Sequence, residues 1–184
     1  SDVKLDYKDV LLRPKRSTLR SRKNVSLQRT YTLKHTQNIW SGVPIMAANM
    51  DGVGTFSMHN ALSKHDLFTC AVKSYDEEQW SAAEFNTDLL ALSTGTGARD
   101  WNKAQNMIEA FKLKWICIDI ANGYSEHFVD FIKTVRHRFP NLNIIAGNVV
   151  TADMTQELIL SGADVVKVGI GPGSVCTTRI QTGV

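Results

Sequence analysis

The sequence predicts an α/β protein with a parallel sheet, either a (β/α)8 barrel or a doubly wound sheet. Short apolar runs alternate with amphipathic stretches along most of the chain, the pattern of repeated βα units. Successive apolar runs start about twenty to thirty residues apart, an interval that fits both folds. Polar and glycine-rich segments follow the runs, at the strand ends where both folds carry their chemistry.

Six apolar runs are predicted as strands, at 43–48, 67–72, 89–93, 115–120, 144–146 and 163–168. Four stretches between them have apolar residues at helical spacing, at 56–65, 101–111, 126–139 and 151–161. Asp100 and Ser125 are the expected N-caps of the second and third helices. Pro140 ends the third helix, and Gly162 follows the fourth.

Composition indicates an ordinary soluble domain, since 43% of the 184 residues are hydrophobic and 21% are charged. No run approaches the roughly 18 apolar residues of a membrane span, and the polar first residues do not resemble a secretory signal. We therefore expect a cytoplasmic protein with no membrane partner. Three widely spaced cysteines give no disulfide framework, and the five histidines form no zinc motif.

Residues 1–40 form a basic lead, and residues 41–184 carry the predicted barrel units. Ten basic residues lie in the lead, namely Lys4, Lys8, Arg13, Lys15, Arg16, Arg20, Arg22, Lys23, Arg29 and Lys34. Such a segment can be a solvated face, or it can bind nucleic acid or a phosphorylated small molecule. Few aromatic residues interleave the charges, so we expect no nucleic-acid partner. A barrel typically takes about 250 residues, and we therefore expect one incomplete catalytic domain holding about the first six βα units.

The loop after the sixth strand, Gly171 to Arg179, contains an unusual cysteine. Cys70 and Cys117 lie inside apolar runs, whereas Cys176 lies among glycines and hydroxyl residues and precedes an arginine. That setting favours an accessible thiolate nucleophile. A phosphate-binding loop with an incidental cysteine is the alternative. A dinucleotide fingerprint is disfavoured, because the third glycine is absent and Pro172 interrupts the turn.

Long segments of the chain resemble the IMP dehydrogenase/GMP reductase family. The matching segments are 9–19, 47–51, 121–128, 146–151, 158–164 and the cysteine loop at 171–179. Thr177-Thr178-Arg179 follows the cysteine, and no regulatory insertion interrupts residues 73–115, so the reductase branch is favoured over the dehydrogenase branch. The resemblance implies a (β/α)8 TIM barrel, a homotetramer, and NADPH-dependent conversion of GMP to IMP and ammonia.

The resemblance also implies the roles of individual residues. Cys176 would attack C2 of the purine and form a thioimidate, and Thr178 would relay a proton with a glutamate beyond Val184. Ser174 would face the nucleotide phosphate. Potassium would be held at Gly171, Gly173, Cys176 and Arg179. NADPH would be bound by Lys73, Asp119, Ile120, Ala121, Ile170 and Gly171, with Ser21 and Arg22 reaching its adenosine end, on a neighbouring subunit.

Two other functions stay open on the sequence alone. The first is an IMP dehydrogenase-like enzyme of the same family. The second is a truncated barrel that binds nucleotide or assembles with partners without turnover. The chain also departs from the family pattern at Val72 and Ser74, where histidines usually flank the lysine, and at Gly52, where threonine is common.

Overall fold

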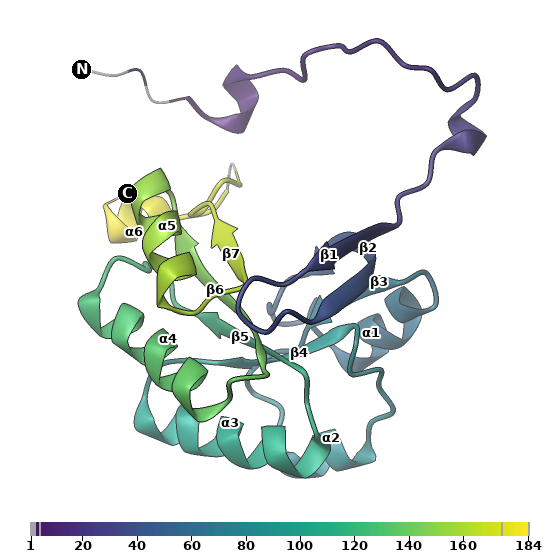
Figure 1. Cartoon of the computed structure of the whole chain (residues 1–184). Coiled ribbons are helices and arrows are strands. Elements are labelled where there is room, and N and C mark those ends of the chain that lie inside the picture. Colours follow the sequence, from purple (N-terminus) through teal and green to yellow (C-terminus); the bar gives the residue numbers. More distant parts are fainter. Residues whose placement is uncertain (1–2, 4, 174, 184) are drawn as a thin grey trace.

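The computed structural model describes residues 3, 5–173 and 175–183, and its centre is a seven-stranded sheet (Figure 1). The strands are β1 (Arg29–Thr32), β2 (Ile39–Ala47), β3 (Leu67–Cys70), β4 (Leu90–Thr94), β5 (Trp115–Asp119), β6 (Asn143–Val149) and β7 (Val165–Val168). The helices are α1 (Phe56–Ser63), α2 (Glu77–Ala82), α3 (Ala98–Phe111), α4 (Glu126–Arg138), α5 (Ala152–Ser161) and α6 (Thr178–Thr182). Short 3-10 turns occupy Tyr7–Asp9 and Arg22–Asn24. Within the described ranges no helix is both long and apolar enough to cross a membrane.

The strands pair in the order in which they occur in the chain. β1 is antiparallel to β2, and every later pair is parallel. A doubly wound sheet reverses its strand order at a switch point, and no such reversal occurs among the strands described here. Consecutive parallel order with a helix after each of β2 to β6 is the arrangement of a (β/α) barrel.

The structure confirms the six predicted strands as β2 to β7 and the four predicted helices as α1, α3, α4 and α5. Ser125 caps α4 as expected, because its hydroxyl accepts from the Phe128 amide at 3.2 Å. The cap predicted at Asp100 is wrong. The third helix of the structure begins at Ala98 after Gly97, and Asp100 lies in its first turn, where its carboxylate contacts Lys73. The β1–β2 hairpin, which begins inside the basic lead, was not predicted.

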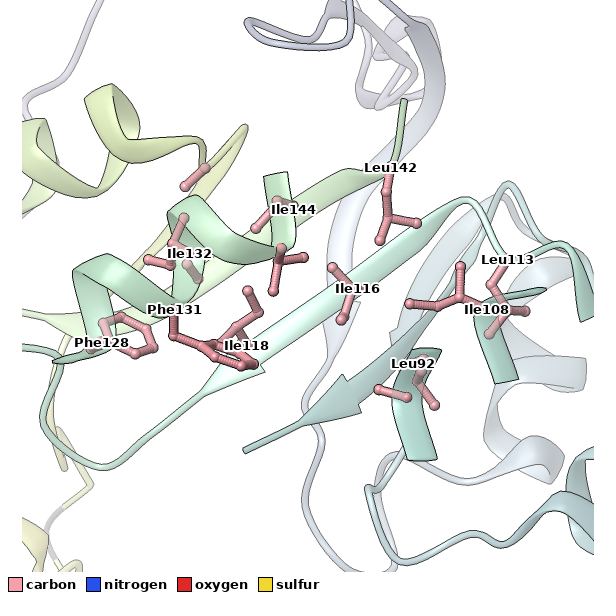
Figure 2. Close-up of a cluster of buried hydrophobic side chains, with 14 of the residues drawn as sticks. Leu92, Ile108, Leu113, Ile116, Ile118, Phe128, Phe131, Ile132, Leu142 and Ile144 are labelled. Atoms are coloured by element: carbon pink, nitrogen blue, oxygen red, sulfur yellow. The ribbon is translucent and has the colours of Figure 1, made fainter. Parts of the chain in front are cut away.

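Along the central strands β3 to β6, side chains alternate between two cores, because these strands are buried on both faces. On β5, Ile116 and Ile118 belong to the core that faces the helices, and Figure 2 shows Ile118 near Phe131 of α4. The intervening Cys117 belongs to the other core, on the opposite face of the sheet, where it packs with residues of four other strands or their ends. This second cluster comprises Leu33, Phe68, Cys70, Leu89, Ala91, Trp115, Cys117 and Ile145.

A buried carboxylate joins three segments at the amino ends of the strands. Asp164 Oδ1 accepts from the His35 amide at 2.9 Å, and Oδ2 accepts from the Ile144 amide at 3.0 Å. The guanidinium of Arg136 donates to the same Oδ2 at 2.7 Å, and the Asp164 side chain is 0% exposed. Arg136 also donates to the carbonyls of Gly162 and Leu142. The hairpin, β6, α4 and the start of β7 are therefore fixed to one another through this carboxylate.

Asp164→Asn is expected to lower the free energy of unfolding by about 3–5 kcal/mol, because it removes one partner of a buried ion pair. Chemical denaturation measures the change. The matched control is Asp88→Asn, which breaks the 2.7 Å Lys114–Asp88 pair between side chains that are 54% and 65% exposed. An exposed pair contributes at most about 1 kcal/mol. Equal losses in the two variants would contradict the role assigned to Asp164.

Candidate functional site

Most of the predicted site residues lie at or directly after the carboxyl ends of three parallel strands, β3, β5 and β7. In a (β/α) barrel, side chains from several strands meet at this end. The structure brings most of the predicted residues into two groups here. One group is the loop of Cys176, and the other is the end of β5 around Asp119.

Cys176 lies exposed in the loop between β7 and α6. Its amide donates to the carbonyl of Gly173 at 3.0 Å, which closes a tight turn. Its Sγ lies 3.3 Å from Oγ1 of Thr178, the first residue of α6. Hydrogen bonds from the Thr178 side chain and backbone lower the pKa of the Cys176 thiol, and the charge of Arg179 lowers it further. The thiolate fraction at neutral pH is therefore above that of an ordinary cysteine.

Gly171 allows this loop to fold tightly around the sulfur. Its φ of +53° lies in the left-handed region, where a side chain is strained. A Cβ at this position would also lie 3.1 Å from Cys176 Sγ and 3.3 Å from the Arg179 amide nitrogen. The residue type at 171 is thus fixed both by backbone conformation and by the closeness of the thiol.

The residues predicted to bind potassium lie together along this loop. Gly171, Gly173 and Cys176 each bring a backbone carbonyl, and carbonyl oxygens suit a hard cation. Among the described residues, no group of three or more histidine, cysteine or acidic side chains could hold a metal ion. The Arg179 guanidinium also contacts Asp6 Oδ2 at 3.2 Å. That contact ties the basic lead to the cysteine loop.

A row of three residues crosses the sheet just before the strands end. Asp119 of β5 pairs in register with Gly147 of β6, and Gly147 pairs with Lys167 of β7. The Lys167 ammonium forms an ion pair with the Asp119 carboxylate across the glycine. It also donates to Oδ1 of Asn49, which follows β2, at 3.1 Å. Burial alone would lower the pKa of Lys167. The nearby Cys117 and Asp119 have a larger opposite effect, so the pKa of Lys167 is raised.

Asn148 connects the loops after β5 and β7. Its amide donates to the Ile120 carbonyl at 3.1 Å, and its side-chain Nδ2 donates to the Gly169 carbonyl at 2.8 Å. Ile120 and Ala121 therefore sit beside the glycine-rich segment that leads to the buried Ile170. These predicted cofactor residues form one continuous edge at the ends of β5, β6 and β7.

Three other predicted residues make contacts outside this edge. Lys73 contacts Asp100 of α3 at 3.3 Å, and its carbonyl accepts from Lys103 at 3.0 Å. Ser21 and Arg22 are exposed in the lead, which arches away from the barrel in Figure 1. Ser21 caps the 3-10 turn that Arg22 begins. Ser174, the predicted phosphate contact, lies outside the described residues.

Sequence reasoning missed Lys167, Asn148 and Asn49 as site residues. A signal was present for Lys167, since it is a single charge in an otherwise apolar strand and shares its face with the core-facing Val165. Asp119 interrupts β5 in the same way, two residues after the buried Cys117. Two opposite charges on the inner faces of nearby strands predict an internal ion pair.

Fold and site together define a (β/α)-barrel domain with an activated cysteine at the carboxyl ends of its strands. The family model described as "IMP dehydrogenase / GMP reductase domain" matches residues 4–184. The chain belongs to the IMP dehydrogenase/GMP reductase family.

Relatives cover the chain completely. It is 58% identical to human GMP reductase 2 and 56% identical to the GMP reductase of Enterobacter sp. (strain 638), over 100% of the chain and 54% of each relative. The chain thus spans about half the length of these relatives. A crystal structure of inosine 5′-monophosphate dehydrogenase from Legionella pneumophila matches with a TM-score of 0.81 and 26% identity, over 98% of this chain and 55% of that one. This likeness confirms the barrel fold.

Thr178→Val is expected to raise the pKa of Cys176, because valine keeps the shape but loses the hydroxyl bonded to the sulfur. The pH profile of iodoacetamide alkylation should move to higher pH, and alkylation at pH 7 should slow. Mass spectrometry of the alkylated peptide measures the rate at Cys176. The buried Cys70 and Cys117 serve as internal controls that react only after unfolding. An unchanged profile would contradict the hydrogen-bond origin of the pKa shift.

Proposed function

We propose that the protein is a GMP reductase, which converts GMP and NADPH to IMP, ammonia and NADP+ in purine salvage. The observation that carries the proposal is the exposed Cys176 whose thiolate is stabilised by Thr178 and Arg179. Identity above one half to proteins named GMP reductase, over the whole chain, supports the reductase rather than the dehydrogenase reaction.

The reaction begins at the sulfur of Cys176. The thiolate attacks C2 of the guanine ring, a C2–S bond forms, and the C2–N2 bond breaks as ammonia leaves. Hydride then arrives at C2, the C2–S bond breaks, and IMP and the thiolate are released. A covalent thioimidate in this way replaces one difficult displacement by two easier steps.

Thr178 is the residue proposed to deliver the proton that the departing amine needs. Its hydroxyl is already hydrogen bonded to Cys176 Sγ, so it would lie beside the carbon that the sulfur attacks. A hydroxyl can pass a proton only with a partner that replaces it. In the family that partner is a glutamate downstream of Val184.

NADPH and potassium are the proposed cofactors. NADPH supplies the hydride when bound, and the edge formed by Asp119, Ile120, Ala121, Ile170 and Gly171 would hold it. Lys73 would contribute from the loop after β3. Ser21 and Arg22 of a neighbouring subunit would bind its adenosine phosphate, since arginine recognises a phosphate dianion well. The carbonyls of Gly171, Gly173 and Cys176 would hold potassium and order the loop, with Arg179 beside them.

We also propose that residues 1–184 are the amino-terminal half of one catalytic barrel domain, which assembles as a homotetramer in the cytoplasm. The coverage of 54% of human GMP reductase 2 supports the first part. Intact-mass measurement of the purified protein tests it. A mass of roughly twice 20.5 kDa is expected, and a mass near 20.5 kDa would contradict it.

Cys176→Ser is expected to abolish NADPH oxidation by GMP in the complete protein, with a loss of at least about 10³-fold in kcat, because an alkoxide at this position is not available at neutral pH. The assay follows NADPH absorbance with and without GMP. An unchanged unfolding temperature in the variant separates lost chemistry from lost structure. Turnover of the variant at the normal rate would exclude the covalent mechanism. A dehydrogenase would instead be indicated if the unchanged protein reduced NAD+ with IMP and did not oxidise NADPH with GMP.

A further inference from the structure

Lys167 is a partly buried charge that the proposed chemistry does not use. It lies on β7 with its side chain turned to the inner face of the sheet, and that side chain is 23% exposed. Its two polar partners are Asp119 and Asn49. A lysine in such a place costs free energy unless its partners repay the loss of water. The contacts with Asp119 and Asn49 therefore have to offset the cost of burying the Lys167 charge.

The glycine between the two charged residues provides the space that their ion pair needs. Gly147 lies in register between Asp119 and Lys167. A Cβ on Gly147 would lie 2.5 Å from the Cβ of Lys167 and 2.7 Å from its carbonyl oxygen. Any larger residue in the middle strand would thus displace Lys167. The absence of a side chain at 147 is what allows the ammonium to pass over β6 and reach Asp119.

The second contact of Lys167 extends across the barrel. β2 and β7 are five positions apart in the strand order, so they are not neighbours in the sheet. The contact from Lys167 to Asn49, directly after β2, joins these distant strands through the interior. The Lys167 ammonium on β7 therefore links the Asp119 carboxylate on β5 to Asn49, which follows β2.

We propose that Lys167 is a positioning residue for the nicotinamide cofactor, acting by holding and neutralising the Asp119 carboxylate. The inference rests on the proposed function, in which Asp119 contacts NADPH. NADPH carries several negative phosphate charges, and an unpaired carboxylate in its site would repel it. With Lys167 in place, the pair is neutral and the carboxylate oxygens keep one orientation toward the cofactor.

The test measures NADPH affinity directly in the complete protein, by calorimetry in the presence of IMP so that no turnover occurs. Lys167→Met is expected to weaken NADPH binding by about tenfold, and Lys167→Arg, which keeps the charge, by about threefold or less. In an Asp119→Asn background, Lys167→Met should cause little further loss, since the carboxylate it acts through is gone. IMP affinity should stay unchanged throughout.

The matched control is Lys114→Met, the same substitution at an exposed ion pair with Asp88, which should leave NADPH affinity unaltered. Unchanged NADPH affinity in Lys167→Met, or additive losses in the double variant, would overturn the proposal. A structural role would be shown instead if Lys167→Met lost NADPH and IMP affinity equally. The same conclusion would follow if Lys167→Met unfolded while the double variant stayed folded. Normal NADPH binding without GMP-dependent oxidation would refute the proposed function alone.

Discussion

The buried carboxylate of Asp164 is the constraint on which the rest of the barrel depends. A charge removed from water is tolerable only when its oxygens are fully engaged, and here the donors come from the hairpin, from β6 and from α4. The three segments have to be in place together for the carboxylate to be satisfied. Because Asp164 immediately precedes β7, the same contacts set where that strand starts, and so where its far end presents the cysteine loop.

The inner face of the sheet changes character from one end to the other. Apolar side chains such as Trp115 and Leu89 fill the layer near the amino ends. Further along β5 the inward side chains are Cys117, in register with Ile145 of β6, and then the charged Asp119. On β5 and β7 the inward charges, Asp119 and Lys167, lie near the carboxyl ends of the strands. The division is that of (β/α) barrels in general, in which chemistry occupies the carboxyl ends.

Apolar periodicity was sufficient to predict six strands and four helices, because each of them buries a continuous face. It could not predict β1, whose four residues are all exposed and are held by pairing with β2. It placed a cap at Asp100 because the residue type is right, whereas the helix starts earlier, after Gly97. The nucleophile was predictable from its local sequence. The charges of Asp119 and Lys167 each stand out in their own strand, but their pairing also depends on the register across three strands, which becomes visible only in the fold.

The missing side chain at Gly171 has a consequence for where the thiol can lie. With Cys176 Sγ only 3.1 Å from the place of the absent Cβ, the sulfur itself fills the volume that a side chain at 171 would take. A side chain at 171 would therefore compete with the nucleophile for the same space. The position of the sulfur above the strand ends thus depends on a residue five places earlier in the chain that contributes no side chain of its own.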